Sequence, residues 1–570
     1  MSARENKKKI IIFQTRRIGD LFQTLPLINN ILKKHNNECN ILVVVDDDFV
    51  NLQSNFKSNI ELIGKKEFYK HYYLNIANNN KLKLNPNEIE LFKLNFKNYY
   101  WNNSNNIAID SSINYDFIYF DEAINLTFDI TNSLILNIID SKVKFGFIGC
   151  GKSEKKNEII CRGKAANYFY NTIKYREQNR INIVDVFSLI GAGRYFLNSK
   201  YNFKFKKIKD KIRIFFVVAS SNSKRDWPVE EFTKLAESII KNFDCEIILL
   251  GTQKEIETAS EIKNGLNHLN HSVIDLTGRT TLNKLIDLLK TGDILISPDT
   301  GLLQIACNIG LDSVSIFLGN ANVYETGPYL KNAYVISPIL SCYPCREPEK
   351  CENNFKCKDN IKADDVFKVL ELKLLGKKYT KKTLLNNLKQ TLQEKRFNVY
   401  KCDTSVSVAY YNIFKQNITK QELIAEIFKY AWINLFAFDE QNKIKKENVI
   451  KIINKKYLFN SKIFNDKNNI IIENLNSELK YLIEIFKNAC SINNIKEKSR
   501  KKYELLNFKN NIVNLKINYP DYSLIFDYFT DEINYKLINN SINFKDIFNE
   551  IIYLVEFSSG ILDNLKIKLK

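Results

Sequence analysis

The chain has 570 residues, of which 45% are hydrophobic and 26% are charged, so it is predicted to be globular rather than disordered. This length is enough for about three or four domains. The formal net charge of +20 favours acidic partners, such as a phosphorylated substrate or an anionic membrane surface. The lysines are spread over every segment, and basic residues are not interleaved with aromatic ones, so we expect no nucleic-acid binding.

Apolar runs in the sequence are short. None reaches the roughly 18 residues that a membrane-spanning helix needs, and the apolar run Ile10–Phe13 is too short for a signal peptide. We therefore expect a cytoplasmic protein. In that reducing compartment its eleven cysteines are expected to be thiols or metal ligands rather than disulfides.

The first half of the chain alternates predicted strands and helices. A strand over Ile10–Phe13 is followed by a loop to Asp20 and a helix over Leu21–Lys34. Residues 65–110 are rich in Asn and weakly patterned, which indicates an insertion or a loosely packed layer. Further strands are expected over 40–45, 116–120 and 145–148. This alternation predicts an open α/β sheet.

A second α/β unit is predicted from Ile212 onward. Its expected strands are 213–218, 246–250, 273–276 and 313–318, and its expected helices are 229–241 and 282–290. The two units predict two facing Rossmann-like domains over residues 1–195 and 212–375, joined by a linker over 196–211. Ligands of such sheets bind at the carboxyl ends of the strands, in the crevice between the domains.

The stretch Ser297–Gly310 is typical of strand, tight turn and helix, with Asp299 and Thr300 at the helix start. Free N–H groups at a helix N-terminus bind phosphate. A carboxylate there is suited to accept hydrogen bonds from ligand hydroxyls. Phosphate beside a polyhydroxyl group indicates a nucleotide sugar, and the alternative is an ordinary N-cap before a core helix.

Four motifs occur in order over roughly residues 8–375. They are Arg17-Ile-Gly-Asp20 with Leu25-Pro26; Ser220 and Ser221 with Lys224, Arg225 and Trp227-Pro228; Asp299-Thr300-Gly301; and Phe317-Leu-Gly319 with Thr326-Gly-Pro328. Taken together, these motifs resemble glycosyltransferase family 9, the lipopolysaccharide-core and protein heptosyltransferases.

The resemblance implies the GT-B arrangement and an inverting transfer of heptose from ADP-heptose. Asp20 matches the family's proposed catalytic base, although an Asp before a helix is also typical of an N-cap. Arg225 stands at the family's lysine position, and Gln304 stands where the family often has His. No catalytic metal is expected. The residues implied to bind the donor are Gly19, Ser220, Ser221, Lys224, Arg225, Asp299, Thr300, Gly301 and Gln304.

Cys342, Cys345, Cys351 and Cys357 have the spacing C-x2-C-x5-C-x5-C within a Pro- and charge-rich loop over 341–358. Four thiolates at such spacing predict a structural site for iron or zinc. Four free thiols are the alternative. Similar cysteine loops occur in the autotransporter heptosyltransferases that the chain resembles, and there iron is bound.

Residues 376–570 lie outside the resemblance and predict a mainly helical extension of unknown role, with helices near 423–438, 479–486 and 546–557. The resemblance and the positive charge favour a lipopolysaccharide-core-type acceptor, met at the inner membrane face. A protein acceptor and a non-enzymatic binding or scaffold protein with an altered cleft are the alternatives. A homo-oligomer is compatible with the sequence.

Overall fold

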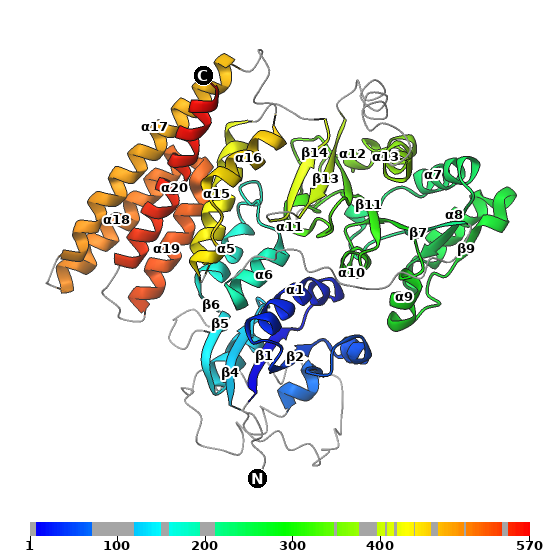
Figure 1. Ribbon diagram of the computed structural model, residues 1–570, viewed down its shortest axis with the longest axis horizontal. Helices are drawn as coiled ribbons and strands as arrows, with labels where there is room; N and C mark the ends of the chain where they lie inside the picture. Colours follow the sequence, from blue (N-terminus) through cyan, green and yellow to red (C-terminus); the bar gives the residue numbers. More distant parts are fainter. Residues whose placement is uncertain are drawn as a thin grey trace, which may run out of the picture.

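A computed structural model gives the fold. It describes residues 7–70, 119–149, 159–193, 211–346, 350–375, 396–404, 407–414, 419–437, 439–457, 465–494, 498–538 and 545–569. Figure 1 shows three parts: a blue-to-cyan α/β half, a green α/β half, and a helical part coloured from yellow to red. No helix of the described residues is both long enough and apolar enough to cross a membrane.

The first half is built on a six-stranded sheet with the order β3-β2-β1-β4-β5-β6. The first five strands are parallel, and β6 is antiparallel to β5. The strands are β1 (Lys8–Gln14), β2 (Cys39–Val45), β3 (Ile60–Gly64), β4 (Phe120–Asn125), β5 (Ser141–Gly149) and β6 (Ile159–Arg162). The helices are α1 (Ile18–Lys34), α4 (Ile130–Ile138), α5 (Lys164–Thr172) and α6 (Ile183–Ala192).

The second half has an eight-stranded sheet with the order β14-β13-β12-β11-β10-β7-β8-β9. Its parallel part, read from β9, has the 3-2-1-4-5-6 order of a Rossmann sheet. The strands are β7 (Ile212–Val217), β8 (Cys245–Leu250), β9 (Val273–Asp275), β10 (Ile294–Pro298), β11 (Asp312–Ile316), β12 (Tyr334–Pro338), β13 (Phe397–Asp403) and β14 (Ala409–Asn412). The helices are α7 (Val229–Asn242), α8 (Ile256–Gly265), α9 (Leu282–Leu289), α10 (Gly301–Ile309), α11 (Val323–Thr326), α12 (Lys356–Asp359) and α13 (Ala363–Leu375).

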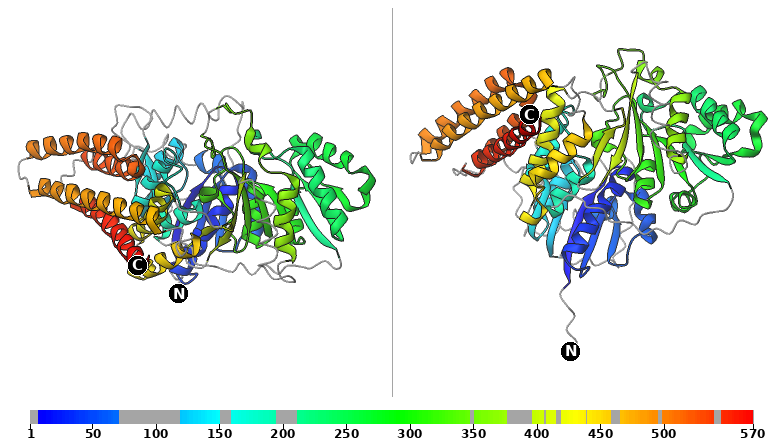
Figure 2. Two further views of the ribbon diagram at one scale, coloured as in Figure 1. Left: turned by 90° about the horizontal axis from the view of Figure 1, so that it is seen from above. Right: turned by 45° about the horizontal axis from the view of Figure 1, so that its top comes forward.

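The helical part packs beside the first half, on the side of α5 and α6 (Figures 1 and 2). It is attached by buried aromatic contacts, such as Tyr168 of α5 against Trp432, with ring centroids 5.2 Å apart. Asn167 of α5 also donates to the carbonyl of Tyr528 at 3.1 Å. Its helices are α15 (Lys420–Phe436), α16 (Lys446–Lys456), α17 (Asn465–Ala489), α18 (Lys498–Asn518), α19 (Ser523–Ile538) and α20 (Lys545–Leu569).

The predicted fold class is confirmed: two Rossmann-like sheets and a mainly helical C-terminal part. The strand expected over 116–120 lies mostly outside the described residues; the structure has β4 at Phe120–Asn125, where the charge of Glu122 is paired with Lys34 Nζ at 2.6 Å. Besides its helices, the part beyond residue 375 holds the strands β13 and β14, which were not predicted: β13 pairs antiparallel with β12, and β14 with β13. Residues 196–210 of the predicted linker and most of the predicted insertion lie outside the described residues.

A proline inside α1 helps to join the two halves. Pro26 lacks an N–H, so it leaves the carbonyl of Phe22, four residues earlier, without its helical donor. Asn308 of α10 fills that place, because its Nδ2 donates to the Phe22 carbonyl at 3.0 Å. The Leu25-Pro26 motif thus frees an acceptor on α1 that the second half uses.

Candidate active site

The first turns of α1 and α10 meet at the carboxyl ends of β1 and β10. Glycines make this contact possible: a methyl group added to Gly301 would lie 2.5 Å from Cγ2 of Ile18, and one added to Gly19 would lie 3.3 Å from the Gly301 Cα. Side chains at either position would separate the helices. The structure therefore brings Asp20 of the first half close to Asp299 of the second.

Asp20 lies at the third position of α1, where its carboxylate accepts a hydrogen bond from the Arg17 backbone N–H at 3.4 Å. The alternative interpretation of Asp20 as the N-cap itself is wrong: Arg17 is the N-cap, and Asp20, three residues later, accepts from the backbone of Arg17. Burial raises the pKa of Asp20, and the negative charge of Asp299 raises it further, against the lowering effect of Arg17 and Arg16. A carboxylate whose proton affinity is raised in this way is a suitable general base.

Asp299 is almost fully buried, with 7% of the residue exposed, and it is paired. Its Oδ2 accepts from Arg225 Nη1 at 3.2 Å and from the Thr326 hydroxyl at 3.0 Å. Burial raises the pKa of Asp299, and the Arg225 charge opposes that rise. In the structure Asp299 therefore orients Arg225.

Arg225 also contacts the loop that contains Ser220 and Ser221, which we call the serine loop. Its Nη2 donates to the Ser221 hydroxyl at 3.1 Å, while its buried Nε has no hydrogen-bond partner among the described residues. The Ser220 hydroxyl donates to the Asn222 carbonyl at 2.7 Å, which holds the loop in a tight turn. Arg225 thus presents an unused donor beside an exposed serine, a combination suited to an anion.

The start of α10 is capped in the way the sequence indicates. The Thr300 hydroxyl accepts from the Leu303 N–H at 3.4 Å and also contacts the Ser297 hydroxyl at 3.0 Å. The N–H of Gly301 belongs to the first turn, whose amides lack partners within the helix. Thr300 and Gly301 therefore lie where an anion would be bound by the helix N-terminus.

A known family matches this part of the chain. The family described as glycosyltransferase family 9 (heptosyltransferase) matches residues 196–356, which include the serine loop, Arg225, the start of α10 and the first two cysteines and Cys351 of the loop. This segment is similar to glycosyltransferase family 9.

Curated relatives share the same segment. A lipooligosaccharide heptosyltransferase 2 of Campylobacter jejuni is 26% identical over 191 residues, which are 32% of this chain and 59% of that protein. A lipooligosaccharide heptosyltransferase 2 of Haemophilus ducreyi is 34% identical over 112 residues, 19% of this chain and 32% of that protein. The chain therefore spans less than two thirds of the length of these relatives.

Solved structures resemble the model over a longer range. The glycosyl transferase family 9 structure from Veillonella parvula has a TM-score of 0.40 at 16% identity, covering 66% of this chain and all of that one. An iron-containing dodecameric glycosyltransferase, TibC of enterotoxigenic E. coli, has a TM-score of 0.37 at 11% identity, covering 68% and 78%.

Two predicted donor-binding residues of the family 9 segment have structural partners. Gln304 is 3% exposed, and its Nε2 donates to the Thr326 carbonyl at 2.8 Å, so it ties α10 to α11. Lys224 follows a turn closed by Asn222, and its carbonyl lies 2.6 Å from where a methyl group on Gly319 would be. Gly319 has φ +58°, so it is required both by its backbone and by this close approach.

Of the four cysteines of the predicted metal site, Cys342, Cys345 and Cys351 precede α12 and Cys357 lies in it, and this segment supports the serine loop. The Cys345 N–H donates to the Gly319 carbonyl at 2.9 Å, and Lys358 Nζ donates to the Ser223 carbonyl at 2.9 Å. Burial raises the pKa of Cys345 and of Cys357, and the other cysteines of the loop raise both further. The described residues nevertheless contain no group of three or more ligand side chains gathered for a metal ion, so a preformed centre is not present.

One functional residue was missed in the sequence. Arg176 follows α5 and joins the first half to the second: it pairs with Glu325 at 2.6 Å and donates to the carbonyls of Asn320 at 2.7 Å and Cys345 at 2.6 Å. Its positive charge also lowers the pKa of Asp299. No motif contains Arg176, so only the fold places it beside the site.

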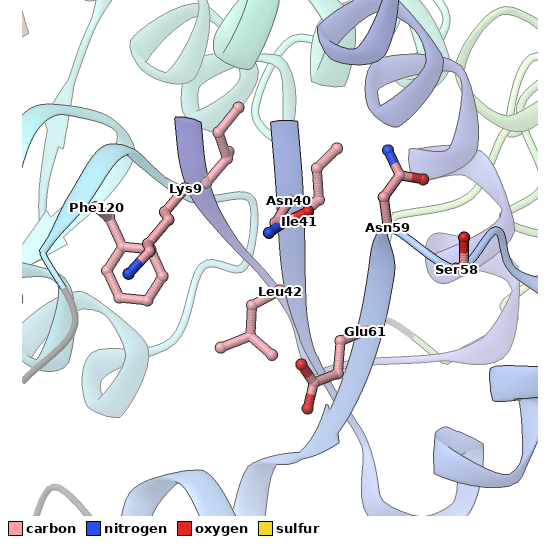
Figure 3. A pocket seen from close by; sticks show the side chains of 9 residues that line it. Lys9, Asn40, Ile41, Leu42, Ser58, Asn59, Glu61 and Phe120 are labelled. Carbon is pink, nitrogen blue, oxygen red and sulfur yellow. The ribbon is translucent and has the colours of Figure 1, made fainter. Parts of the chain in front are cut away.

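A hollow of about 290 Å³ lies elsewhere, against the first sheet (Figure 3). Lys9, Asn40 and Phe120 line it at the amino-terminal ends of their strands, together with Ser58 and Glu61. Asp20 and Asp299 follow the carboxyl ends of β1 and β10. The hollow therefore contains none of the predicted site residues.

Proposed function

We propose that the protein is an inverting glycosyltransferase that transfers heptose from ADP-heptose to a lipopolysaccharide-core-type acceptor. The observation that carries this proposal is the close approach of Gly19 to Gly301, which sets Asp20 against the pair of Asp299 and Arg225. A base and an anion-binding group then face each other across the junction of the two halves. The family 9 match and the heptosyltransferase relatives support the choice of sugar donor.

In the proposed reaction the carboxylate of Asp20 takes the proton of the acceptor hydroxyl. The acceptor oxygen forms a bond to the anomeric carbon from the face opposite the diphosphate, and the bond from that carbon to the diphosphate oxygen breaks. ADP departs with the bonding electrons. Ser221, Arg225 and the first-turn N–H of Gly301 stabilise the negative charge on the departing diphosphate.

The acceptor is proposed on charge. The net charge of +20 suits an acidic glycolipid on an anionic membrane face better than it suits a neutral protein surface. A protein acceptor is the second candidate, favoured by the cysteine loop. A binding or scaffold protein without transferase activity is the candidate of another class, favoured by the hydrogen bond that takes Gln304 away from the donor.

The experiment measures heptose transfer from ADP-heptose to heptose-deficient lipopolysaccharide core and, separately, to a serine-containing protein acceptor, by mass spectrometry. Wild type is compared with Asp20→Asn and with Asp140→Asn, an exposed carboxylate of the same half that serves as control. We expect Asp20→Asn to bind ADP-heptose in calorimetry and to lose at least about 100-fold in transfer. Transfer that persists in Asp20→Asn would refute the base assignment, and a wild type that binds no nucleotide sugar would refute the enzyme.

We further propose that the four-cysteine loop binds a structural iron or zinc ion when the metal is available. The Cys345 N–H donates to the Gly319 carbonyl at 2.9 Å, so metal binding to the loop would fix Gly319 and the serine loop behind Arg225. Metal analysis of the purified protein tests this. About one metal per chain that is lost in a Cys345→Ser, Cys357→Ser double variant supports the site, and metal-free wild type contradicts it.

A further inference from the structure

Helix α18 carries an apolar stripe on its outward face. The stripe consists of Tyr503, Leu506, Asn510, Val513 and Ile517. The four hydrophobic side chains are 62%, 41%, 56% and 72% exposed in that order, and Asn510 is exposed as well. These are large exposed fractions for such residues, and they lie in succession along one helix.

The stripe is separate from the face that holds α18 in the fold. Leu505, Phe508, Ile512 and Leu515 are at most 8% exposed and face the core. Phe508 packs edge-on against Phe486 of α17 and Phe548 of α20, with ring centroids 5.9 Å and 5.3 Å apart. On one flank Lys509 and Lys516 also bind α19, through Asn534 Oδ1 at 2.8 Å and Asp527 Oδ1 at 2.9 Å. Because these contacts and the inner face hold α18, the outer stripe is available for another partner.

The spacing of the stripe identifies the kind of partner. Its members follow one another at intervals of three, four, three and four residues, which are the a and d positions of two heptads. The residues beside it are polar: Lys502, Lys509 and Lys516 on one flank, and Asn507 and Asn514 on the other. A stripe this narrow fits the groove of a single helix, whereas a helix lying on a lipid surface presents a wider apolar face.

We propose that α18 pairs with α18 of a second copy of this chain as a short, parallel, two-stranded coiled coil. Asn510 lies at an a position, and in a parallel pair a positions face each other, so Asn510 contacts the partner's Asn510. A single buried Asn at an a position fixes two strands and one register. Because the second chain is identical, it places its own Asn510 in the same layer of the coiled coil.

The flanks also favour the parallel pair. In this arrangement Lys502 comes beside the partner's Asn507, so lysine meets amide, while Lys509 keeps its bond to Asn534 of α19. An antiparallel pair would bring the two lysine flanks together and would set Asn510 against an apolar residue of the partner. That arrangement would leave an amide without its partner in the seam.

The position of α18 leaves room for the second copy. Figures 1 and 2 show α17 and α18 at the end of the molecule opposite α8 and α9, beyond the helices that contact the first sheet. Pairing through α18 would therefore keep both active-site junctions accessible.

The test is sedimentation velocity on the full chain from about 1 to about 100 μM. Wild type is expected to change from monomer to dimer over this range, and Val513→Asp with Ile517→Asp is expected to stay monomeric with unchanged circular dichroism. The control is Ile256→Asp on α8, an exposed isoleucine outside the stripe, which should dimerise like wild type. A wild type that is monomeric throughout, or a stripe variant that still dimerises, would overturn the proposal.

A second measurement fixes the orientation. N510C is expected to form a disulfide-linked dimer on mild oxidation, above the background that wild-type cysteines give, because only a parallel pair brings both positions 510 together. Absence of that product in a dimer would exclude the parallel pair. The alternative is a membrane-binding stripe. If the wild type is monomeric but sediments with phosphatidylglycerol vesicles, and the Val513→Asp, Ile517→Asp variant does not, the stripe binds a membrane and the proposal is overturned.

Discussion

Arg225 Nη1 lies 3.2 Å from Asp299 Oδ2, and both residues are less than one tenth exposed. The pair joins the serine loop to the start of α10. It therefore fixes the position of Arg225, the group proposed to bind the diphosphate, before any ligand arrives. A donor diphosphate would share Arg225 with Asp299 rather than encounter a freely moving side chain.

The first prediction concerns this pair. Arg225→Met leaves the Asp299 carboxylate buried without its partner, so the free energy of unfolding should fall by about 3 kcal/mol. Adding Asp299→Asn should recover much of that loss. Urea unfolding of both variants measures the effect. Arg213→Met, which breaks the half-exposed pair with Glu246, is the control and should cost less than about 1 kcal/mol. Equal losses in the two single variants would contradict the predicted role of burial.

The second prediction is a dependence of stability on pH. Burial raises the pKa of Asp20, so the folded state favours the protonated acid. The contribution of Asp20 to stability is complete at a pH below the pKa that Asp20 has in the unfolded chain. It is lost as the pH rises through the pKa that Asp20 has in the folded chain. Asp20→Asn should remove that loss and raise Tm more at pH 8 than at pH 4. Differential scanning calorimetry at both values tests it, and a Tm difference that does not grow with pH would contradict it.

The third prediction concerns the junction glycines. Gly301→Ala places a methyl 2.5 Å from Ile18 Cγ2, so it should push α1 from α10 and lower kcat/KM by about 10- to 100-fold. Gly19→Ala, whose methyl would lie 3.3 Å from its nearest neighbour, should cost less. Ile18→Ala combined with Gly301→Ala should restore part of the activity. A double variant no better than Gly301→Ala would show that the clash with Ile18 is not the cause.

The fourth prediction concerns the attachment of the helical part. Glu532 accepts from Asn167 Nδ2 at 2.6 Å, and burial, together with the Glu550 charge, raises its pKa to about 7. The contribution of Glu532 to stability is present at a pH below the pKa that Glu532 has in the unfolded chain, and it is lost as the pH rises toward 7. Glu532→Gln keeps the acceptor without the charge, so it should stabilise the protein by about 1–3 kcal/mol at pH 8 and little at pH 4. Denaturant unfolding at both pH values measures this, and an equal effect at both would contradict it.

Much of the two sheets could be predicted because their strands are apolar runs closed by polar turns. The strand expected over 213–218 is β7 at Ile212–Val217, and the helix expected from Leu282 begins there. Strand β4 was missed because Glu122 interrupts its pattern, and its partners Lys34 and His35 are distant in sequence. The strands beyond residue 375 were missed because they depend on pairing with β12.

The motifs gave the residues of the candidate site, and the structure pairs Arg225 with Asp299 at 3.2 Å. The contacts between motifs were not predictable: the bond from Thr326 to Asp299 joins two separate motifs, and Arg176 lies in no motif. Which side chains complete a charge pair depends on tertiary contacts that spacing in sequence does not encode.

Strand β13 covers one side of β12, and β14 in turn covers β13. A chain cut after α13 would expose the unpaired N–H and C=O groups of β12 along a buried, apolar strand. Such a bare edge is a template for pairing with other chains and leads to aggregation. The strands β13 and β14 therefore protect the second half from self-polymerisation, and a shortened version of this protein would need a new edge strand before it could stay in solution.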